Sequence, residues 1–429
     1  MREEIKTRIE AVRRGEIPEG YVFNNHQIRP IDWQYGKIGK YLTSYDEFSN
    51  DTVKYPLATS SRQGLMLQSE YYSDQRYEET SGGFHVVPEG YVTYRHMSDD
   101  DIFRFNVNRM GTPVLVSPEY PVFTTTPRLN QELLIAYLNN MKEFTAYCSA
   151  QKKGSTRTRM YFSRLGEFEM PIPPLAEQQK IAEILSTCDC VIELKQQLLD
   201  EKRKQKQWLM QMLLDPDSGV RLPGFEGSRW IEHKLGDFGY CIRGVSYDPK
   251  KDLADSESPR TVTLFRANNI GIDDLIKDDI QFVDSDRVSE MQLVKPGDIA
   301  ISMSSGSKKA VGKTLYIRKG YKNSCFGAFC AIFRSKHNAF IKHLFESRGY
   351  QKALSTILEG TNICNLTNGD IEGLAFWIPE DDAEMRRITS VLSTADKEIY
   401  ALSKELEAWQ KKKKALMQLL LTGLVRVNA

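Results

Sequence analysis

The chain has 429 residues, of which 41% are hydrophobic and 27% charged, and its formal net charge at pH 7 is +1. These values are typical of a soluble globular protein with two or three domains. A net charge near zero excludes a uniformly basic surface, so any affinity for nucleic acid must come from local patches. No apolar run approaches the roughly 20 residues of a membrane span. The seven cysteines show no zinc-binding spacing, and no signal peptide is apparent. We therefore expect no metal, no cofactor and a cytoplasmic location.

Four predicted segments follow one another along the chain. Residues 1–170 are expected to form a globular unit of mixed strands and helices, and residues 171–215 a long helix. Residues 216–376 are expected to form a second α+β unit, and residues 377–429 a second long helix. Prolines fit the beginning of a helix but not its interior, and they precede both helices at Pro173-Pro174 and Pro379. Asp215-Pro216 and Thr422-Gly423 are expected to end them.

The two helical segments are copies of one sequence. The 39 residues from Ala176 and the 39 residues from Ala383, which lies 207 positions later, share about sixteen identities without a gap. The repeat continues upstream, where Trp33–Gly39 matches Trp230–Gly236 and Val87–Gly90 matches Val294–Gly297. The two helices are similar along their whole sequence, while the globular units share only these short motifs. This pattern predicts a common scaffold that carries two different readers.

Apolar residues in both helices recur at spacings of three and four, which indicates a coiled-coil seam. In the second helix the seam is Ile388, Leu392, Ala395, Ile399, Leu402, Leu406, Trp409, Leu416 and Leu420, interrupted by Lys413. In the first helix it is Ile181, Leu185, Cys188, Ile192, Leu199, Leu209 and Leu213, interrupted by Lys195, Lys202 and Lys206. We expect an antiparallel pair with a pseudo-twofold axis between the globular units. A partner helix from another chain is the alternative. The basic runs 202–206 and 411–414 are read as solvated faces rather than as DNA contacts.

The stretch SSGSKKAVGKT, residues 304–314, resembles a phosphate-binding loop. That motif requires a glycine five positions before Gly312, where this chain has Ser307. The motif must also open a helix, whereas Lys313 and Thr314 begin an alternating, strand-like segment. We therefore predict a strand–loop–strand with a cationic tip and not an ATP site. Such a tip suits phosphate contact, although it can equally be a solvated hairpin.

The order of these segments and the motifs within them resemble the specificity subunit of Type I restriction–modification systems. The resemblance rests on the Trp-x-x-x-Lys-[Ile/Leu]-Gly opening of each unit, on Lys-Pro-Gly-Asp-Ile-Ala-Ile-Ser, and on Leu-Ser-Thr-x-Asp in both helices. Pro-Ile-Pro-Pro-Leu-Ala-Glu-Gln-Gln-Lys-Ile before the first helix is its most characteristic segment. It covers the chain from about Pro30 to the end. The second copy departs from the pattern, because Glu-Asp-Asp-Ala-Glu-Met-Arg replaces the Pro-Leu-x-Glu-Gln-Gln element there.

The resemblance implies a non-catalytic subunit that reads a bipartite site in double-stranded DNA, with one target recognition domain for each half-site. The paired helices act as the spacer in that family. They also help to dock two adenine-methylating modification subunits, which restriction subunits then join. No methyltransferase or Walker motif is complete in the chain, which agrees with this class of protein.

Arg, Lys, Asn, Gln and Ser side chains contact bases and phosphates, so residues of these types in the predicted loops are the candidate DNA-reading residues. In the first unit they are Arg62, Gln63, Arg95, Lys152, Lys153 and Arg157. In the second unit they are Arg266, Asn268, Asn269, Ser304, Ser305, Ser307, Lys308, Lys309 and Lys313. Asn362 and Asn365 are further candidates, although asparagine also serves turns. A coiled-coil scaffold that binds proteins and a nuclease without a recognisable motif remain as alternatives.

Overall fold

The structure is a computed structural model and describes residues 3–24, 27–71, 83–152, 157–272, 274–306, 310–359 and 365–427. Its residues form two compact units: Met1–Leu194 with Leu406–Ala429 (unit 1), and Lys195–Glu405 (unit 2). Each long helix therefore contributes one part to each unit. The division at residues 170, 215 and 376 stays a prediction.

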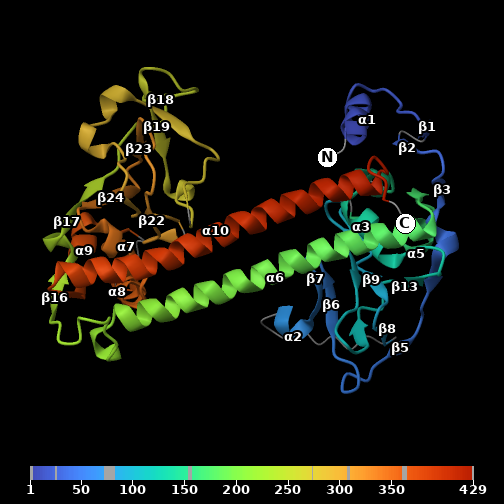
Figure 1. Ribbon diagram of the computed structural model, residues 1–429, viewed down its shortest axis with the longest axis horizontal. Helices are drawn as coiled ribbons and strands as arrows, with labels where there is room; N and C mark the ends of the chain where they lie inside the picture. The colour runs from blue at the N-terminus through green and yellow to red at the C-terminus, as the bar shows by residue number, and fades with distance from the viewer. Residues whose placement is uncertain are drawn as a thin grey trace. The chain divides into compact units, whose positions relative to one another are not determined.

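The two predicted long helices are confirmed as α6, Leu175–Leu213, and α10, Asp382–Leu421 (Figure 1). α6 begins directly after Pro173-Pro174, and α10 begins three residues after Pro379. The helices pack together, and within unit 2 they run antiparallel, because Lys195 pairs with Glu405 while Lys202 pairs with Glu398.

The predicted seam is largely buried. Its buried members are Ile181, Leu185, Cys188, Leu199, Leu213, Ile388, Leu392, Ile399, Leu406 and Leu420. The four lysines that interrupt it each reach a carboxylate on the facing helix. Lys195, Lys202 and Lys206 pair with Glu405, Glu398 and Asp396 in unit 2, and Lys413 pairs with Asp189 in unit 1. The interruptions are therefore charge pairs between the helices.

Unit 1 mixes short strands with short helices, as expected. Its strands are β1 Tyr21–Asn24, β2 Gln27–Pro30, β3 Gln34–Lys37, β4 Leu42–Ser44, β5 Phe48–Ser49, β6 Ala58–Ser61, β7 Gly64–Leu67, β8 Phe84–Val87, β9 Val92–Tyr94, β10 Met97–Ser98, β11 Phe105–Val107, β12 Val114–Val116, β13 Val122–Thr125, β14 Thr158–Arg159 and β15 Glu169–Ile172. Its shorter helices are α1 Glu3–Arg13, α2 Gln68–Tyr71, α3 Gln131–Asn140, α4 Lys142–Ala150 and α5 Phe162–Gly166. The largest sheet has the order β11-β9-β13-β4, and its core includes side chains of α3, α6 and α10.

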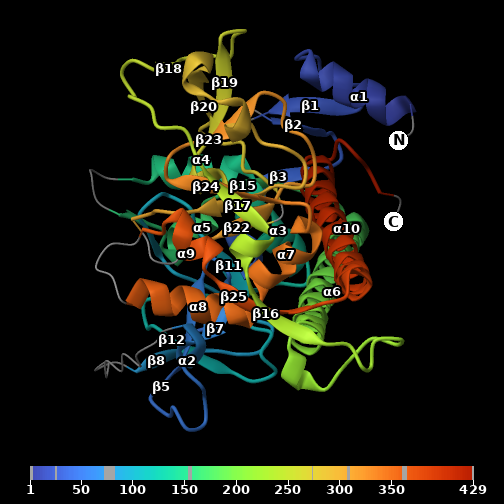
Figure 2. The same cartoon turned by 90° about the vertical axis from the view of Figure 1, so that its left-hand side faces the viewer.

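Unit 2 is built in the same way. Its strands are β16 Trp230–Lys234, β17 Gly239–Arg243, β18 Leu253–Ala254, β19 Thr261–Phe265, β20 Gln281–Asp284, β21 Ile299–Ser302, β22 Thr314–Tyr316, β23 Ser324–Phe326, β24 Cys330–Ser335 and β25 Ala375–Pro379. Its shorter helices are α7 Asn338–Glu346, α8 Arg348–Glu359 and α9 Asn368–Glu372. The two sheets have the orders β17-β24-β21-β22 and β18-β20-β19-β23. In Figure 2, β18 and β19 lie at the opposite end of this unit from β16 and β25.

The opening motif of each repeat forms the same structure. β3 pairs with β15, and β16 pairs with β25, so each opening strand lies beside the strand that leads into the long helix. The backbone N–H of Ile38 donates to Phe168 and that of Leu235 to Leu374, both at 2.9 Å. The Trp-x-x-x-Lys motif is therefore the strand that attaches each globular part to its helix.

The second matched segment is a glycine turn before a hairpin. Gly90 and Gly297 have φ values of +81° and +91°, which favour glycine. Their N–H groups donate to Asn108 and Ile317, both at 2.8 Å. The turns lead into β9, which pairs with β11, and into β21, which pairs with β22. The two units therefore present equivalent hairpins, whose loops are residues 95–104 and 303–313.

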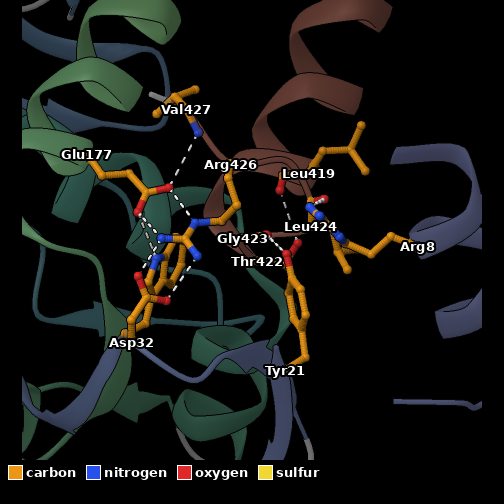
Figure 3. A network of polar contacts seen from close by, with 11 residues as sticks. Arg8, Tyr21, Asp32, Glu177, Leu419, Thr422, Gly423, Leu424, Arg426 and Val427 are labelled. Carbon is orange, nitrogen blue, oxygen red and sulfur yellow. Dashed lines mark hydrogen bonds and ion pairs between the residues drawn. The ribbon is translucent and has the colours of Figure 1, made fainter. Parts of the chain in front are cut away.

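A buried glutamate lies at the beginning of each long helix. Glu177 is 3% exposed and Glu384 is 1% exposed, 207 positions apart. Trp33 donates its indole N–H to Glu177 at 2.9 Å, and Arg426 donates to the same carboxylate at 2.8 and 2.9 Å (Figure 3). Arg426 also donates two hydrogen bonds to Asp32.

The segment after α10 also contacts residues near the N-terminus within unit 1. Arg8 donates to the carbonyl of Leu424 at 3.0 Å, and the Tyr21 hydroxyl donates to the carbonyl of Gly423 at 2.6 Å (Figure 3). Gly423 has a φ of +70°, and a Cβ there would lie 2.5 Å from Pro30. This close approach requires glycine. The predicted end of the helix at Thr422-Gly423 is confirmed.

We expect Arg426→Gln to destabilise unit 1 by about 1–3 kcal/mol, because it leaves the buried Glu177 carboxylate without its charged partner. Urea unfolding followed by circular dichroism measures the effect on the transition of this unit. Arg14→Gln is the control, since Arg14 pairs with Glu16 on the surface and such pairs contribute little. Equal midpoints for the two variants would show that the Arg426 contacts do not stabilise the unit.

Candidate nucleic-acid interface

The stretch that resembles a phosphate-binding loop is a hairpin loop in unit 2. β21 and β22 flank it, with Ile301 opposite Thr314. Thr314 therefore begins a strand and not a helix, which confirms the strand–loop–strand prediction. Gly312 has a φ of +76°, and a Cβ there would lie 2.3 Å from the side chain of Leu354. The glycine of Gly-Lys-Thr is explained by this turn and contact.

The segment after α8 runs beside this loop. Ser304 and Asn365 form a β-bridge, and Leu366 donates its N–H to Met303 at 2.7 Å. Ser304 and Ser305 are half-buried, and Lys313 is exposed. The structure thus brings three predicted readers and Asn365 to one place. Ser307, Lys308, Lys309 and Asn362 lie outside the described residues.

Two residues at this place carry no signal in the sequence. Phe329 is 68% exposed, and its carbonyl accepts the N–H groups of Met303 and Ser304 at 2.8 and 3.1 Å. Arg243 donates to the carbonyls of Ala328 and Leu366 at 2.7 and 3.0 Å. Arg243 therefore joins the turn of Phe329 to the segment of Asn365. Only the tertiary fold shows this contact.

The three candidates Arg266, Asn268 and Asn269 have different environments in the structure. Asn269 is fully buried, and its amide donates to the carbonyls of Ile276 and Asp278 at 2.9 and 2.8 Å. In this conformation it holds its loop and presents no edge to a ligand. Arg266 forms an ion pair with Asp279, and Asn268 is exposed. Of the three, Asn268 alone presents its side chain freely to solvent in the described part of unit 2.

Unit 1 has the equivalent arrangement. Met97 and Ser98 of β10 pair with Arg159 and Thr158 of β14, and Met160 donates its N–H to the carbonyl of His96 at 2.8 Å. The segment after α4 therefore runs beside the loop 95–104, as the segment after α8 does in unit 2. Arg95 is exposed at the beginning of this loop.

Three predicted cations converge on three consecutive aspartates of that loop. Arg157 pairs with Asp99 at 2.6 Å, Arg62 with Asp100 at 2.5 Å, and Lys152 with Asp101 at 3.7 Å. The hydrogen bond from Arg62 lowers the pKa of Asp100, and the hydrogen bond from Thr158 lowers the pKa of Asp101. Residues distant in sequence thus form one polar surface. The sequence predicted the cations but not their partners.

The turn between β6 and β7 places Arg62 at this surface. Asn106 donates to the Ser60 hydroxyl at 2.8 Å and to the Ser61 carbonyl at 2.9 Å, which ties the turn to β11. Gln63 is exposed in the same turn. Lys153 lies outside the described residues.

Tyr161 was not predicted as a site residue, and it lies beside His96 of the loop. His96 is buried and stacks on Tyr161, with 5.8 Å between the ring centroids. Burial lowers the pKa of His96. Tyr161 is half exposed beside the loop and offers a flat apolar surface, as Phe329 does in unit 2. An exposed aromatic ring therefore accompanies both loops.

Metal clusters, disulfides and membrane-spanning helices are absent from the residues that the structure describes. No three His, Cys, Asp or Glu side chains among them are placed to hold a metal ion. The six cysteines of this part of the chain are free of disulfides. Among the same residues, no helix is both long and apolar enough to cross a membrane.

Comparisons with known proteins agree with the sequence motifs. A family model described as Type I restriction modification DNA specificity domain matches residues 89–201. The specificity subunit of the Type I restriction enzyme EcoKI from Escherichia coli K12 is 33% identical over 168 residues, which are 38% of this chain and 36% of that protein. The MjaVIII specificity subunit from Methanocaldococcus jannaschii is 26% identical over 326 residues, 70% of this chain and 72% of that protein.

The fold is also that of solved specificity subunits. The crystal structure of a Type I restriction–modification S subunit from M. genitalium superposes with a TM-score of 0.58 and 16% identity, covering 93% of this chain and 97% of that chain. A chain from a study of complex assembly in a Type I system gives a TM-score of 0.51 at 14% identity, covering 92% and 99%. At these identities the likeness shows the fold alone.

These matches confirm the predicted resemblance to Type I restriction–modification specificity subunits. They also agree with the assignment of the chain to a non-catalytic class of subunit. In the alignment with the EcoKI subunit the chain spans about a third of that relative's length.

Lys313→Ala tests phosphate contact by the loop of unit 2. We expect its affinity for an unrelated DNA duplex to fall, and the slope of log K against log salt to decrease by about 0.9 for the lost contact. Fluorescence anisotropy at several salt concentrations measures both. The matched control is Lys336→Ala, an exposed lysine of unit 2 that lies after β24. If the two variants have the same slope, Lys313 does not contact phosphate.

Proposed function

We propose that this chain is the DNA-specificity subunit of a Type I restriction–modification complex. It reads a bipartite site in double-stranded DNA, with one recognition domain for each half-site. The observation that supports this best is the equivalence of the loops 95–104 and 303–313. Each loop follows a strand that begins after a glycine turn, and each lies beside the segment that follows a short helix, α4 in unit 1 and α8 in unit 2. Predicted readers gather at both loops.

The chemistry of the two loops suits different half-sites. Around residues 95–104, arginines and a lysine pair with Asp99, Asp100 and Asp101. Around residues 303–313, Ser304 forms a β-bridge with Asn365, and the exposed Lys313 lies at the other end of the loop. Arginine reads guanine, asparagine reads adenine, and aspartate accepts from cytosine. We therefore propose that each unit reads its own sequence, and we leave the buried Asn269 out of the reading set.

The long helices act in this proposal as the spacer and as the docking surface. Helices of 39 and 40 residues extend about 60 Å at 1.5 Å per residue. Within unit 2, α6 exposes Leu198 and Trp208 toward one side of an ideal helix, at 47% and 58%. Exposed apolar side chains of this size are typical of protein interfaces. We propose that two modification subunits dock here and that restriction subunits join the complex in the cytoplasm.

Mapping adenine methylation across the host genome, with this gene intact and interrupted, tests the function directly. We expect the interruption to remove methylation from one split motif, two short half-sites around a constant gap. The control is restoration of the motif by the intact gene supplied in trans. If methylation is unchanged, and native purification yields no modification subunit, the proposed function is wrong.

Lengthening the helix pair tests the spacer. Seven residues that continue the heptad, inserted after Gln197 in α6 and after Ser403 in α10, preserve the seam and add about 10 Å. At about 3.4 Å per base pair, the preferred gap should grow by about three base pairs. Methylation mapping of the variant measures the gap. Seven residues inserted between Glu226 and Gly227, in the exposed connection before β16, should leave it unchanged. An unaltered gap in the helix variant would exclude the spacer role.

A further inference from the structure

A cluster of charged side chains is built around Asp396 in unit 2. We call Lys206, Arg318, Lys342, Glu346 and Asp396 the Asp396 cluster. The ammonium groups of Lys206 and Lys342 each lie 2.5 Å from the Asp396 carboxylate, and Arg318 lies 3.9 Å from it. Lys206 also lies 2.5 Å from Glu346. Asp396 and Lys342 are 7% and 8% exposed, so these contacts are largely shielded from water.

The cluster is charged in the folded protein. Burial by itself opposes ionisation of Asp396, but Lys206 and Lys342 outweigh it and lower the pKa of this carboxyl to about 2. Burial also disfavours the charged form of Lys206, and Glu346 and Asp396 outweigh that effect and raise its pKa. A buried pair of this kind adds little net stability compared with apolar side chains, but removing one partner is costly. We therefore expect such a cluster to fix the relative orientation of the elements it joins rather than to raise the free energy of unfolding.

The cluster joins the reading hairpin to both helices. Lys206 belongs to α6 and Asp396 to α10, while Lys342 and Glu346 belong to α7. Arg318 follows β22, the strand that leaves the loop 303–313. The ammonium of Lys342 also lies 5.2 Å from the ring centroid of Tyr316 in β22. Arg318 and Tyr316 are thus the two residues by which this strand contacts the cluster, and a rotation of the hairpin on the helix pair would break both contacts.

The equivalent place in unit 1 has no such cluster among its described residues. Lys206 and Asp396 correspond to Lys413 and Asp189 at the offset of 207, and these do pair, but Asp189 is 59% exposed. Lys342 and Glu346 correspond to Ile135 and Asn139. A cavity of about 340 Å³ lies there, lined by Asp189, Lys413, Ile135 and Asn139 among others. The cluster is thus a property of unit 2 and not of the repeat.

We infer that the Asp396 cluster is the positioning element that fixes the second reading hairpin on the helix pair, and thereby makes recognition selective for one gap length. This inference rests on the proposed function. Asp396 touches no DNA in it and acts only through the orientation of β21 and β22. The pair of Lys413 and Asp189 holds the helices together without orienting a hairpin.

Asp396→Asn tests the inference, and Asp189→Asn is the matched control. Each is isosteric and removes one charge from an equivalent pair. Once the target is mapped, competition binding compares duplexes with the native gap and with gaps one base pair shorter and longer. We expect Asp396→Asn to reduce the preference for the native gap about tenfold. Its affinity for a duplex that carries the second half-site alone should stay within about twofold. Asp189→Asn should keep the wild-type preference.

A second variant covers loss of folding. If Asp396→Asn unfolds, Lys206→Met removes one cation, keeps the long side chain and leaves Lys342 paired with Asp396. The same fall in gap preference is expected, with thermal unfolding as the control for folded protein. A folded Asp396 or Lys206 variant with full gap preference overturns the inference, and so does an equal fall in Asp189→Asn. If the wild type binds no split site, the proposed function has failed first.

Discussion

The pairing of α6 with α10 is the constraint on which the rest of the structure depends. The apolar seam supplies the buried surface, and four lysines within it reach carboxylates on the facing helix. An apolar seam alone permits several registers that differ by a heptad. Charge pairs spaced unevenly along the seam satisfy one register and leave charges unpaired in the others. The lysines that interrupt the repeat therefore specify the alignment of the two helices.

Each globular part attaches to this pair by the same few contacts. An opening strand pairs with the strand before the long helix, and a buried glutamate lies at the beginning of that helix. A short 3-10 helix follows each opening strand, at Ile38–Tyr41 and at Leu235–Asp237. The partners of the two glutamates differ. Glu177 is bound by Trp33 and Arg426, whereas Glu384 accepts from Ser228. The attachment of each globular part to its helix is thus repeated, while the contacts of the two glutamates have diverged.

In the two loops the position in the fold is conserved between the units, while the side chains differ. Their place in the fold is the same in both units, but one gathers aspartates with arginines and the other gathers serines with lysine. A loop can change its side chains without disturbing the hairpin below it, because the glycine turn and the strand pairing use backbone groups. Buried charge differs as well. Unit 2 anchors its hairpin through Asp396, while unit 1 has a cavity at the equivalent place.

The sequence by itself determined the repeat, the two helices and their ends, the seam, and the strand–loop–strand around Gly312. These features follow from local spacing, proline and glycine, and they need no knowledge of distant contacts. The tertiary structure alone decided which candidate readers lie together, because Arg62, Lys152 and Arg157 meet only through Asp99–Asp101 of another segment. It also decided that Asn269 is internal and that Phe329 and Tyr161 are exposed. Residue type predicts what a side chain can bind, but burial and neighbours decide what it is free to bind.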